Sequence, residues 1–249
     1  MSKTLIFSDV HLKVSPEDRP RHARFVRFLN SFDPAEYRQI ICLGDLFDFW
    51  FEYREVIFSG YFEVLRAFAN LRDAGCELHL ICGNHDFWGG RFLRDELGFA
   101  IHPDCFETQL GSQRVRFVHG DGINPADRSY RVYKRFARNP FVVGTFRLIH
   151  PDWAMRIAQG VSHGSRTIKK EHDPANGPEA KALQAYAQGV LARGEADAVF
   201  CGHAHAPAHL HFPTPTGTGT YINTGDWFHN FSYVISDGDS LELKTWSGT

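Results

Sequence analysis

Carboxylate, imidazole and amide side chains recur in five short motifs, and each motif follows or ends an apolar run. The motifs are Asp9-Val10-His11, Gly44-Asp45-Leu46-Phe47-Asp48, Gly83-Asn84-His85-Asp86, His119-Gly120-Asp121 and Gly202-His203-Ala204-His205. Short apolar runs are typical of buried strands, and in α/β sheets the carboxyl ends of the strands carry ligand-binding groups. The pattern therefore predicts one polar site built at several strand ends.

These donor types favour two divalent metal ions. Carboxylates and imidazoles together suit Mn²⁺, Fe or Zn²⁺ better than Mg²⁺, which prefers oxygen ligands alone, and we expect Mn²⁺. The expected ligands are Asp9, His11, Asp45, Asn84, His119, His203 and His205. Asp45 is the candidate bridge, because a carboxylate has two oxygens to share. Asp9 and His11 can reach one ion with one of the two late histidines, while Asn84 and His119 reach the second ion with the other.

The chemistry that follows from such a pair is hydrolysis at phosphorus. Two ions roughly 3.5–4 Å apart can activate a bridging hydroxide and stabilise both oxygens of an in-line displacement. His85 is expected to protonate the leaving oxygen or stabilise phosphoryl charge. Asp48 is expected to hold the His85 imidazole and raise its pKa, although it could instead cap the following helix. Asp86 and Asp121 suit either support of the ligands or loop hydrogen bonds.

The elements that must position these residues alternate between strand and helix up to about residue 119. We expect strands near 4–8, 38–43 and 77–82, helices near 20–31, 59–74 and 90–97, and strands near 105–110 and 114–119. The carboxyl-terminal part is strand-rich, with expected strands at 197–201, 207–213, 219–223, 231–236 and 241–246. This order predicts an α/β fold in which a largely parallel sheet packs on a second, mixed sheet, with helices outside. We expect one domain, 1–249.

Residues 124–172 interrupt this alternation and are expected to form a helical cap insertion. They hold ten Lys or Arg residues against three acidic residues, and an aromatic and aliphatic stretch runs over 141–157. One interpretation is a solvated basic helix beside one core helix. The other is a cap that offers apolar surface and cations to an anionic lipid or membrane.

Composition narrows the class of protein. The net charge of −2 over 249 residues argues against general nucleic-acid binding. The amino-terminus runs directly into the first expected strand, which leaves no room for a signal peptide, and no apolar stretch reaches the ~18 residues of a membrane span. The five cysteines are odd in number and mostly lie in apolar runs, so we expect buried, reduced thiols in a cytoplasmic protein.

The five motifs, in this order, resemble the calcineurin-like metallophosphoesterase superfamily. The resemblance implies a four-layer α/β/β/α sandwich with a dinuclear metal site. It also implies the two ligand sets: Asp9, His11, Asp45 and His205 for one metal, and Asp45, Asn84, His119 and His203 for the other.

Within that superfamily the chain looks most like the UDP-2,3-diacylglucosamine hydrolases of lipid A biosynthesis. The residues that carry this resemblance are Ser8 to Leu12, Gly44 to Trp50, Gly83 to Phe87, His119 to Gly122, Asp127 with Tyr130, and Gly202 to Pro207. The resemblance implies cleavage of a UDP-sugar lipid to UMP and diacylglucosamine 1-phosphate by a cytoplasmic protein bound peripherally to the anionic inner-membrane surface. It also implies substrate-binding roles for Asn84, Trp50, Asp127, Ser165 and Lys169.

One residue departs from that pattern, because His85 stands where the best-known lipid A hydrolases have arginine. The alternative function is therefore a water-soluble metal-dependent phosphoesterase acting on nucleotides or phosphoproteins. A third, that of a protein-binding scaffold, would be marked by lost ligand positions, and here every one is filled. The sequence gives no indication of the oligomeric state.

Overall fold

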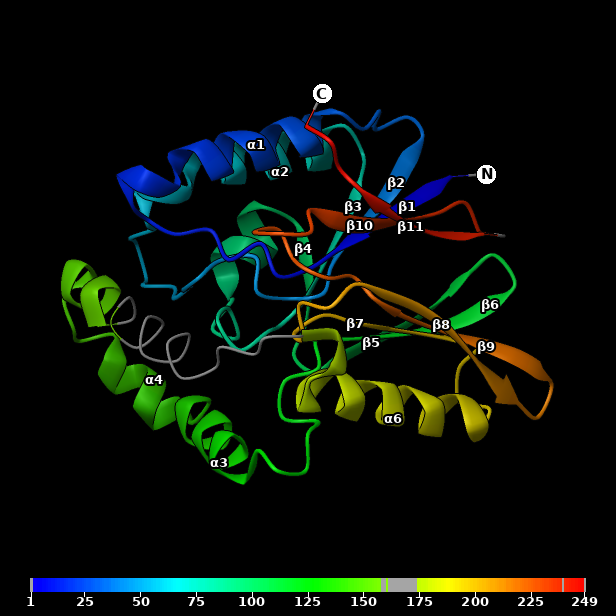
Figure 1. The fold of residues 1–249 in the computed structure, drawn as a ribbon. Helices are drawn as coiled ribbons and strands as arrows, with labels where there is room; N and C mark the ends of the chain where they lie inside the picture. The colour runs from blue at the N-terminus through cyan, green and yellow to red at the C-terminus, as the bar shows by residue number, and fades with distance from the viewer. Residues whose placement is uncertain (1, 158–159, 161–173, 239, 249) are drawn as a thin grey trace.

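The computed structural model describes residues 2–157, 160, 174–238 and 240–248. Two β-sheets lie face to face between two layers of helices, which is the expected four-layer sandwich (Figure 1). Ser165 and Lys169, expected to bind substrate, lie outside the described residues.

The first sheet has the strand order β11-β10-β1-β2-β3-β4. Its strands are β1 (Lys3–Phe7), β2 (Tyr37–Cys42), β3 (Glu77–Ile81), β4 (Phe99–His102), β10 (Ser232–Ser236) and β11 (Leu241–Thr245). Strands β1 to β4 are parallel, whereas β10 and β11 add an antiparallel edge. Helices α1 (Arg19–Asn30) and α2 (Phe62–Asp73) cover its outer face, and short 3₁₀ helices at Pro16–Asp18 and Ser59–Tyr61 precede them (Figure 1).

The second sheet is mixed and has the order β5-β6-β7-β9-β8. Its strands are β5 (Cys105–Leu110), β6 (Gln113–Val118), β7 (Ala198–Cys201), β8 (Ala208–Thr214) and β9 (Gly217–Asn223). Helix α6 (Pro178–Ala192) covers its outer face, after a short 3₁₀ helix at Pro174–Asn176. The central strands β6, β7 and β9 run parallel, so their carboxyl ends meet at one edge.

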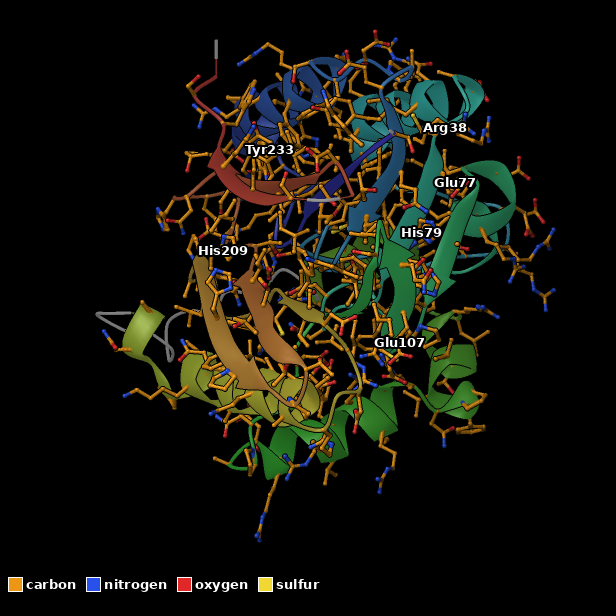
Figure 2. The ribbon with its side chains drawn as sticks, turned by 90° about the vertical axis from the view of Figure 1, so that its right-hand side faces the viewer. Arg38, Glu77, His79, Glu107, His209 and Tyr233 are labelled. Atoms are coloured by element: carbon orange, nitrogen blue, oxygen red, sulfur yellow. The ribbon has the colours of Figure 1, made fainter. Side chains whose placement is uncertain are left out.

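Strand alternation divides the core into layers. Leu5 and Phe7 of β1 face the helices, whereas Ile6 between them packs into the cluster that separates the sheets. Phe117 and Phe200 of the second sheet lie in the same inter-sheet cluster. Figure 2 shows the sheets one above the other, with Tyr233 on the first and Glu107 and His209 on the second.

The 124–172 insertion begins with two helices beside the sandwich, at the end where the parallel strands finish (Figure 1). These are α3 (Arg128–Ala137) and α4 (Pro140–Phe146), and residues 151–157 are also helical. Phe141 and Leu148 are 82% and 85% exposed. On the inner side, Met155 joins a buried cluster with Phe49 and Phe51, so the insertion is apolar on two faces.

The expected elements are confirmed, with three additions or changes. Strand β4 and helix α6 were not predicted, and the expected helix at 90–97 is a single π-helical turn, Phe92–Glu96. A signal for α6 was present, because Leu183, Ala187 and Val190 repeat at helical spacing after a proline at the helix start. No helix among the described residues is long and apolar enough to cross a membrane.

The prediction about the cysteines is wrong for one of them. Cys42, Cys76, Cys82 and Cys201 are buried and free, but Cys105 is exposed. The reason is positional, because β5 is an edge strand and Cys105 is its first residue.

The aromatic layer under α1 provides a test of the fold. Phe28 has no exposed surface, and its ring lies 4.2 Å from that of Trp227 and 5.0 Å from that of Tyr233. Phe28→Ala should lower the free energy of unfolding by about 3–5 kcal/mol, because it leaves a cavity in a close-packed core. Urea unfolding measures this. The control is Phe62→Ala, which removes a ring that is 58% exposed and should change stability by less than about 0.5 kcal/mol.

Candidate metal centre

The loops after β1 and β7 bring together the first group of donors, Asp9, His11 and His205. The Nε2 atoms of His11 and His205 lie 3.3 Å apart, and Oδ1 of Asp9 lies 3.1 Å from Nε2 of His205 and 3.6 Å from Nε2 of His11. His11 and Asp9 are buried, while His205 is partly exposed. The ligand atoms of these three residues all lie within 4.8 Å of one another, and such a convergent group can hold a cation.

The second group forms around Asp45, in the loop after β2. Its Oδ2 atom lies 3.5 Å from Nε2 of His11 and 3.5 Å from Nε2 of His119, so one carboxylate faces both groups. Oδ1 of Asn84 lies 3.2 Å from Nε2 of His119. The ring of His203 packs against that of His119 at 5.1 Å. All seven expected ligands therefore lie in one cluster, and Asp45 has the position that a bridge requires.

The backbone is strained at these positions. Asp9, His11, Asp45, His203 and His205 have φ between +47° and +64°, and Phe231 is the only other non-glycine residue with positive φ in the described chain. A left-handed conformation is unfavourable for side-chain-bearing residues and persists only where the surrounding structure enforces it. The strain turns each donor away from the strand direction into the cluster.

Hydrogen bonds to backbone carbonyls orient two of the imidazoles. Nδ1 of His119 lies 2.7 Å from the carbonyl oxygen of Leu43, and Nδ1 of His85 lies 2.8 Å from that of Asp48. A carbonyl accepts only, so each Nδ1 is the donor, and each Nε2 is turned toward the site. Metal-ligating histidines are oriented by the same kind of hydrogen bond from the second ring nitrogen.

The donor cluster is electrostatically coupled. Burial lowers the pKa of His11 and of His203 to about 4. Burial also opposes protonation of His119, but the charge of Asp45 outweighs it and raises the pKa of His119 to about 10. Burial works against ionisation of Asp45, yet the imidazoles of His119 and His85 hold its pKa far below the ordinary value. Metal ligands must be deprotonated, so a cation bound here takes the place of the His119 proton.

Buried polar residues around the cluster fix its loops. The carboxylate of Asp86 accepts hydrogen bonds from the backbone N–H groups of Leu46 and Gly83, both at 2.8 Å. The Ser8 hydroxyl donates to Asp9 and lies 2.6 Å from the hydroxyl of Thr224. The geometry thus gives Asp86 a loop-holding role, one of the two expected for it.

Asp121 ties the cap insertion to the donor cluster. Its carboxylate accepts a hydrogen bond from the Tyr130 hydroxyl at 2.6 Å and pairs with the ammonium group of Lys134 at 2.7 Å. Both partners belong to α3, and Asp121 lies two residues after His119. Asp127, expected to bind substrate, is the partly buried residue immediately before α3.

Two expected side-chain roles meet a different geometry. The backbone carbonyl of Asp48 accepts the hydrogen bond from Nδ1 of His85, while its carboxylate lies 3.8 Å from Nδ1 of His11 and within 4.8 Å of a ring nitrogen of His85. The expectation that Trp50 touches substrate is corrected, because its side chain is fully buried, stacks on Phe47 and donates to Glu52. The loop packs inward there because Glu52 also accepts three backbone N–H groups from residues 90–93.

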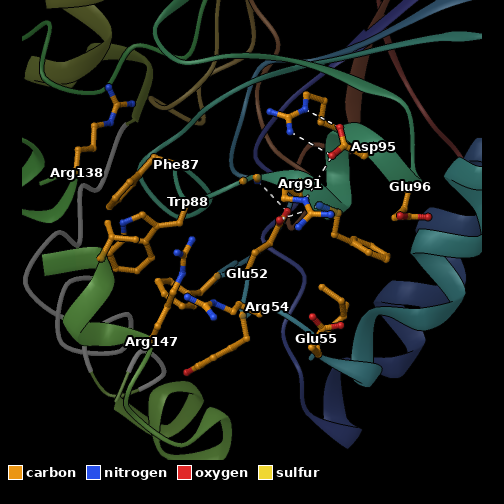
Figure 3. Close-up of a pocket in the computed structure, with 18 residues that line it drawn as sticks. Glu52, Arg54, Glu55, Phe87, Trp88, Arg91, Asp95, Glu96, Arg138 and Arg147 are labelled. Carbon is orange, nitrogen blue, oxygen red and sulfur yellow. Dashed lines mark hydrogen bonds and ion pairs between the residues drawn. The ribbon is translucent and has the colours of Figure 1, made fainter. Parts of the chain in front are cut away.

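A cavity of about 1060 Å³ lies between the 51–57 and 87–96 loops and the cap (Figure 3). Phe87 and Trp88 line it, directly after His85 and Asp86, and Arg138 and Arg147 reach it from the cap. Its lining residues are Phe51 to Glu55, Ile57, Phe87 to Phe92, Arg94 to Glu96, Arg138, Val143 and Arg147.

Two neighbours of the donors were not found from the sequence. The ring of Phe228 stacks on His11 at 5.1 Å and lies 5.4 Å from the ring of His205. Arg21 donates from Nη2 to the carbonyl oxygen of His11 at 2.6 Å. Neither belongs to one of the five motifs, so only their approach in space connects them to the site.

The close packing of glycine against the donors gives a test of the site. A Cβ atom at Gly83 would lie 2.7 Å from the backbone N of Asp45 and against its carboxylate. Gly83→Ala should therefore displace Asp45 and reduce bound metal, and should lower the free energy of unfolding by roughly 1–3 kcal/mol. Elemental analysis and urea unfolding measure both. Gly144→Ala, where a Cβ meets nothing within 4 Å, should leave metal content and stability nearly unchanged; equal effects in the two variants would contradict the packing argument.

Comparison with known proteins agrees with this geometry. The family model for calcineurin-like phosphoesterases matches residues 2–207. A protein of Porphyromonas gingivalis named UDP-2,3-diacylglucosamine hydrolase is 32% identical, over 98% of this chain and 97% of its own. A protein of the same name from Neisseria meningitidis serogroup B is 30% identical over 96% of each chain, and one from Edwardsiella ictaluri is 31% identical over 66% of this chain and 61% of its own. The chain described here belongs to the calcineurin-like phosphoesterase family.

Proposed function

We propose that the protein is a metal-dependent hydrolase that cleaves the pyrophosphate bond of UDP-2,3-diacylglucosamine, giving UMP and 2,3-diacylglucosamine 1-phosphate. The observation that carries this proposal is the cap cavity beside the donor cluster, which combines Phe87 and Trp88 with the cations Arg138 and Arg147. A lipid that bears phosphate needs both kinds of surface. The relatives that match nearly the full chain are named for this substrate.

The seven clustered donors fit a dinuclear centre. Asp9, His11, Asp45 and His205 would hold one ion, and Asp45, Asn84, His119 and His203 would hold the other. Mixed carboxylate, amide and imidazole ligands suit Mn²⁺, with Fe or Zn²⁺ as alternatives. When bound, such a pair supplies an activated water and charge stabilisation at phosphorus.

His85 is the residue proposed to act on the leaving group. Its Nδ1 is held by the carbonyl of Asp48, and its Nε2 lies 4.0 Å from Asp45 and therefore faces the cluster. The side chain is 20% exposed, so a substrate can reach it. A proton on Nε2 would pass to the bridging oxygen of the pyrophosphate as the sugar phosphate leaves.

The cap would bind the lipid half and contact the membrane. Its inner residues Val143 and Phe146 pack toward Trp88, where acyl chains can enter, while Phe141 and Leu148 are exposed outward. Basic residues on α3 and after α4, including Arg135, are placed to meet anionic headgroups. We infer peripheral binding at the cytoplasmic face of the inner membrane, and substrate-binding roles for Asp127, Ser165 and Lys169.

The assay that tests the function follows UMP release from UDP-2,3-diacylglucosamine in the presence of Mn²⁺, beside cleavage of bis-p-nitrophenyl phosphate. Rapid UMP release with feeble cleavage of the small diester is expected, because only the lipid substrate fills the cap cavity. Cleavage of the small diester alone would favour a phosphoesterase with a water-soluble substrate.

His119 and His85 should differ when each is replaced. His119→Ala should abolish activity and reduce bound metal, because it removes a ligand. His85→Ala should slow UMP release by about 10²–10⁴-fold at unchanged metal content, which is the usual contribution of a general acid. Metal analysis beside the rate assay separates the two roles, and equal metal loss in both variants would refute the role given to His85.

Charge reversal on the cap tests membrane binding. Arg135→Glu with Arg147→Glu should weaken binding to vesicles containing anionic lipid by roughly tenfold or more, since each basic residue near such a surface contributes about 1 kcal/mol. Vesicle sedimentation measures the bound fraction. The matched control, Arg27→Glu with Arg66→Glu, makes the same charge change on α1 and α2 and should bind as the unmodified protein does. Equal weakening in both pairs would show that net charge, not the cap, governs binding.

A further inference from the structure

A second cavity, of about 390 Å³, adjoins the donor cluster through Phe228. It lies between the beginning of α1 and the loop 227–231, and it shares no lining residue with the cap cavity. Phe228 connects it to the donors, because the ring stacks on His11 and lies beside His205. A molecule bound at the metal ligands can therefore extend into this cavity without entering the cap.

Aromatic rings and guanidinium groups dominate the lining. The guanidinium of Arg21 lies 5.1 Å from the centre of the Phe228 ring, and that of Arg24 lies 4.6 Å from the centre of the Phe231 ring. Trp227 is fully buried and packs edge to face against Phe231, which supports that ring. Flat rings and planar cations are the surfaces on which nucleobases stack.

Two donors in the lining have no hydrogen-bond partner among the described residues. They are Nε of Arg21 and the indole Nε1 of Trp227, and both are shielded from solvent. Each can only donate, so each requires an acceptor. The two carbonyl groups of a uracil ring are acceptors of this kind.

The loop that carries the rings is held in a strained conformation. Phe231 has φ of +47°, a conformation otherwise found at non-glycine residues only among the metal-donor positions of the described chain. The carboxylate of Asp226 accepts hydrogen bonds from the backbone N–H groups of Phe228 and His229, both at 2.7 Å, and so fixes the turn that follows it. Strain of this kind, maintained by surrounding contacts, concentrates at ligand-binding positions.

We propose that this second cavity binds the uracil and ribose of the substrate's nucleotide half, while the cap cavity takes the lipid half. The assignment rests on the proposed function, because it takes a pyrophosphate with two different ends as the substrate. The scissile pyrophosphate bond must lie at the donor cluster. Each end of the substrate must therefore extend away from the cluster in its own direction. The polar, aromatic and donor-rich cavity suits the nucleotide, and the cap with its apolar surfaces suits the acyl chains.

Calorimetric titration of the Mn²⁺-loaded protein with UMP and with ribose 5-phosphate tests this assignment. Both compounds carry the phosphate, so the difference between their affinities reports the base. UMP should bind about tenfold more tightly, within the range that base stacking on aromatic side chains provides. Arg24→Gln and Phe231→Ala should each remove most of that difference and leave ribose 5-phosphate binding unchanged. Arg27→Gln, an exposed arginine one turn further along α1, should behave as the unmodified protein does.

The outcomes separate the subsite from the function. Equal affinity for UMP and ribose 5-phosphate in the unmodified protein, or full UMP affinity in both cavity variants, overturns the subsite. Loss of UMP affinity on Arg147→Gln instead would place the base in the cap cavity and also overturn it. UMP binding through Arg24 and Phe231 in a protein that leaves UDP-2,3-diacylglucosamine intact would support the subsite and refute the proposed substrate. Arg24 is exposed, so its variant tests the proposal even if Phe231→Ala fails to fold.

Discussion

Asp45 is almost completely buried, and one of its carboxylate oxygens lies 3.5 Å from the Nε2 atoms of both His11 and His119. A buried carboxylate is tolerated only where opposite charge and hydrogen bonds offset the loss of hydration. Here the other oxygen accepts the backbone N–H of His85, and the imidazole of His119 supplies positive charge. This requirement also constrains the neighbouring residues. Each histidine must be oriented toward Asp45, and each loop must turn tightly enough to bring its donor close to that carboxylate. Several features therefore help to stabilise this one buried charge: the residues in the left-handed conformation, the close packing of Gly83, and the backbone carbonyls that orient His119 and His85.

The sandwich makes such a cluster possible by aligning two sheets. Donors from the first sheet follow β1, β2 and β3, whereas His119, His203 and His205 follow β6 and β7 of the second. The inter-sheet cluster that includes Ile6 and Phe117 sets the separation at which the two groups meet. Stability and catalysis are therefore coupled, since a change in inter-sheet packing would move one set of donors relative to the other.

Two cavities flank the cluster, and they differ in chemistry. The cap cavity is tied to the donors by Asp121, which accepts hydrogen bonds from α3 close to His119. The second cavity is tied to them by Phe228, which stacks on His11. A dinuclear hydrolase with this arrangement can recognise both ends of an asymmetric pyrophosphate while the reacting phosphorus stays at the metals.

Local sequence patterns, which are apolar runs that end in Asp, His or Asn at short spacing, predict the family and the layered fold, and both are confirmed. The same patterns predict the seven candidate donors, and the structure brings these side chains into one cluster. Composition also distinguished residues 124–172, whose basic character differs from the rest of the chain and which contain helices α3 and α4. Helix α6 and strand β4 were not predicted from the sequence. Small residues weaken the helical pattern of α6, and β4 is only four residues long. Tertiary packing buries Trp50, brings the Asp48 carbonyl to His85, and sets Arg21 and Phe228 beside the donors. Those outcomes depend on which distant segments pack together, and no spacing along the chain encodes a contact between residues 11 and 228.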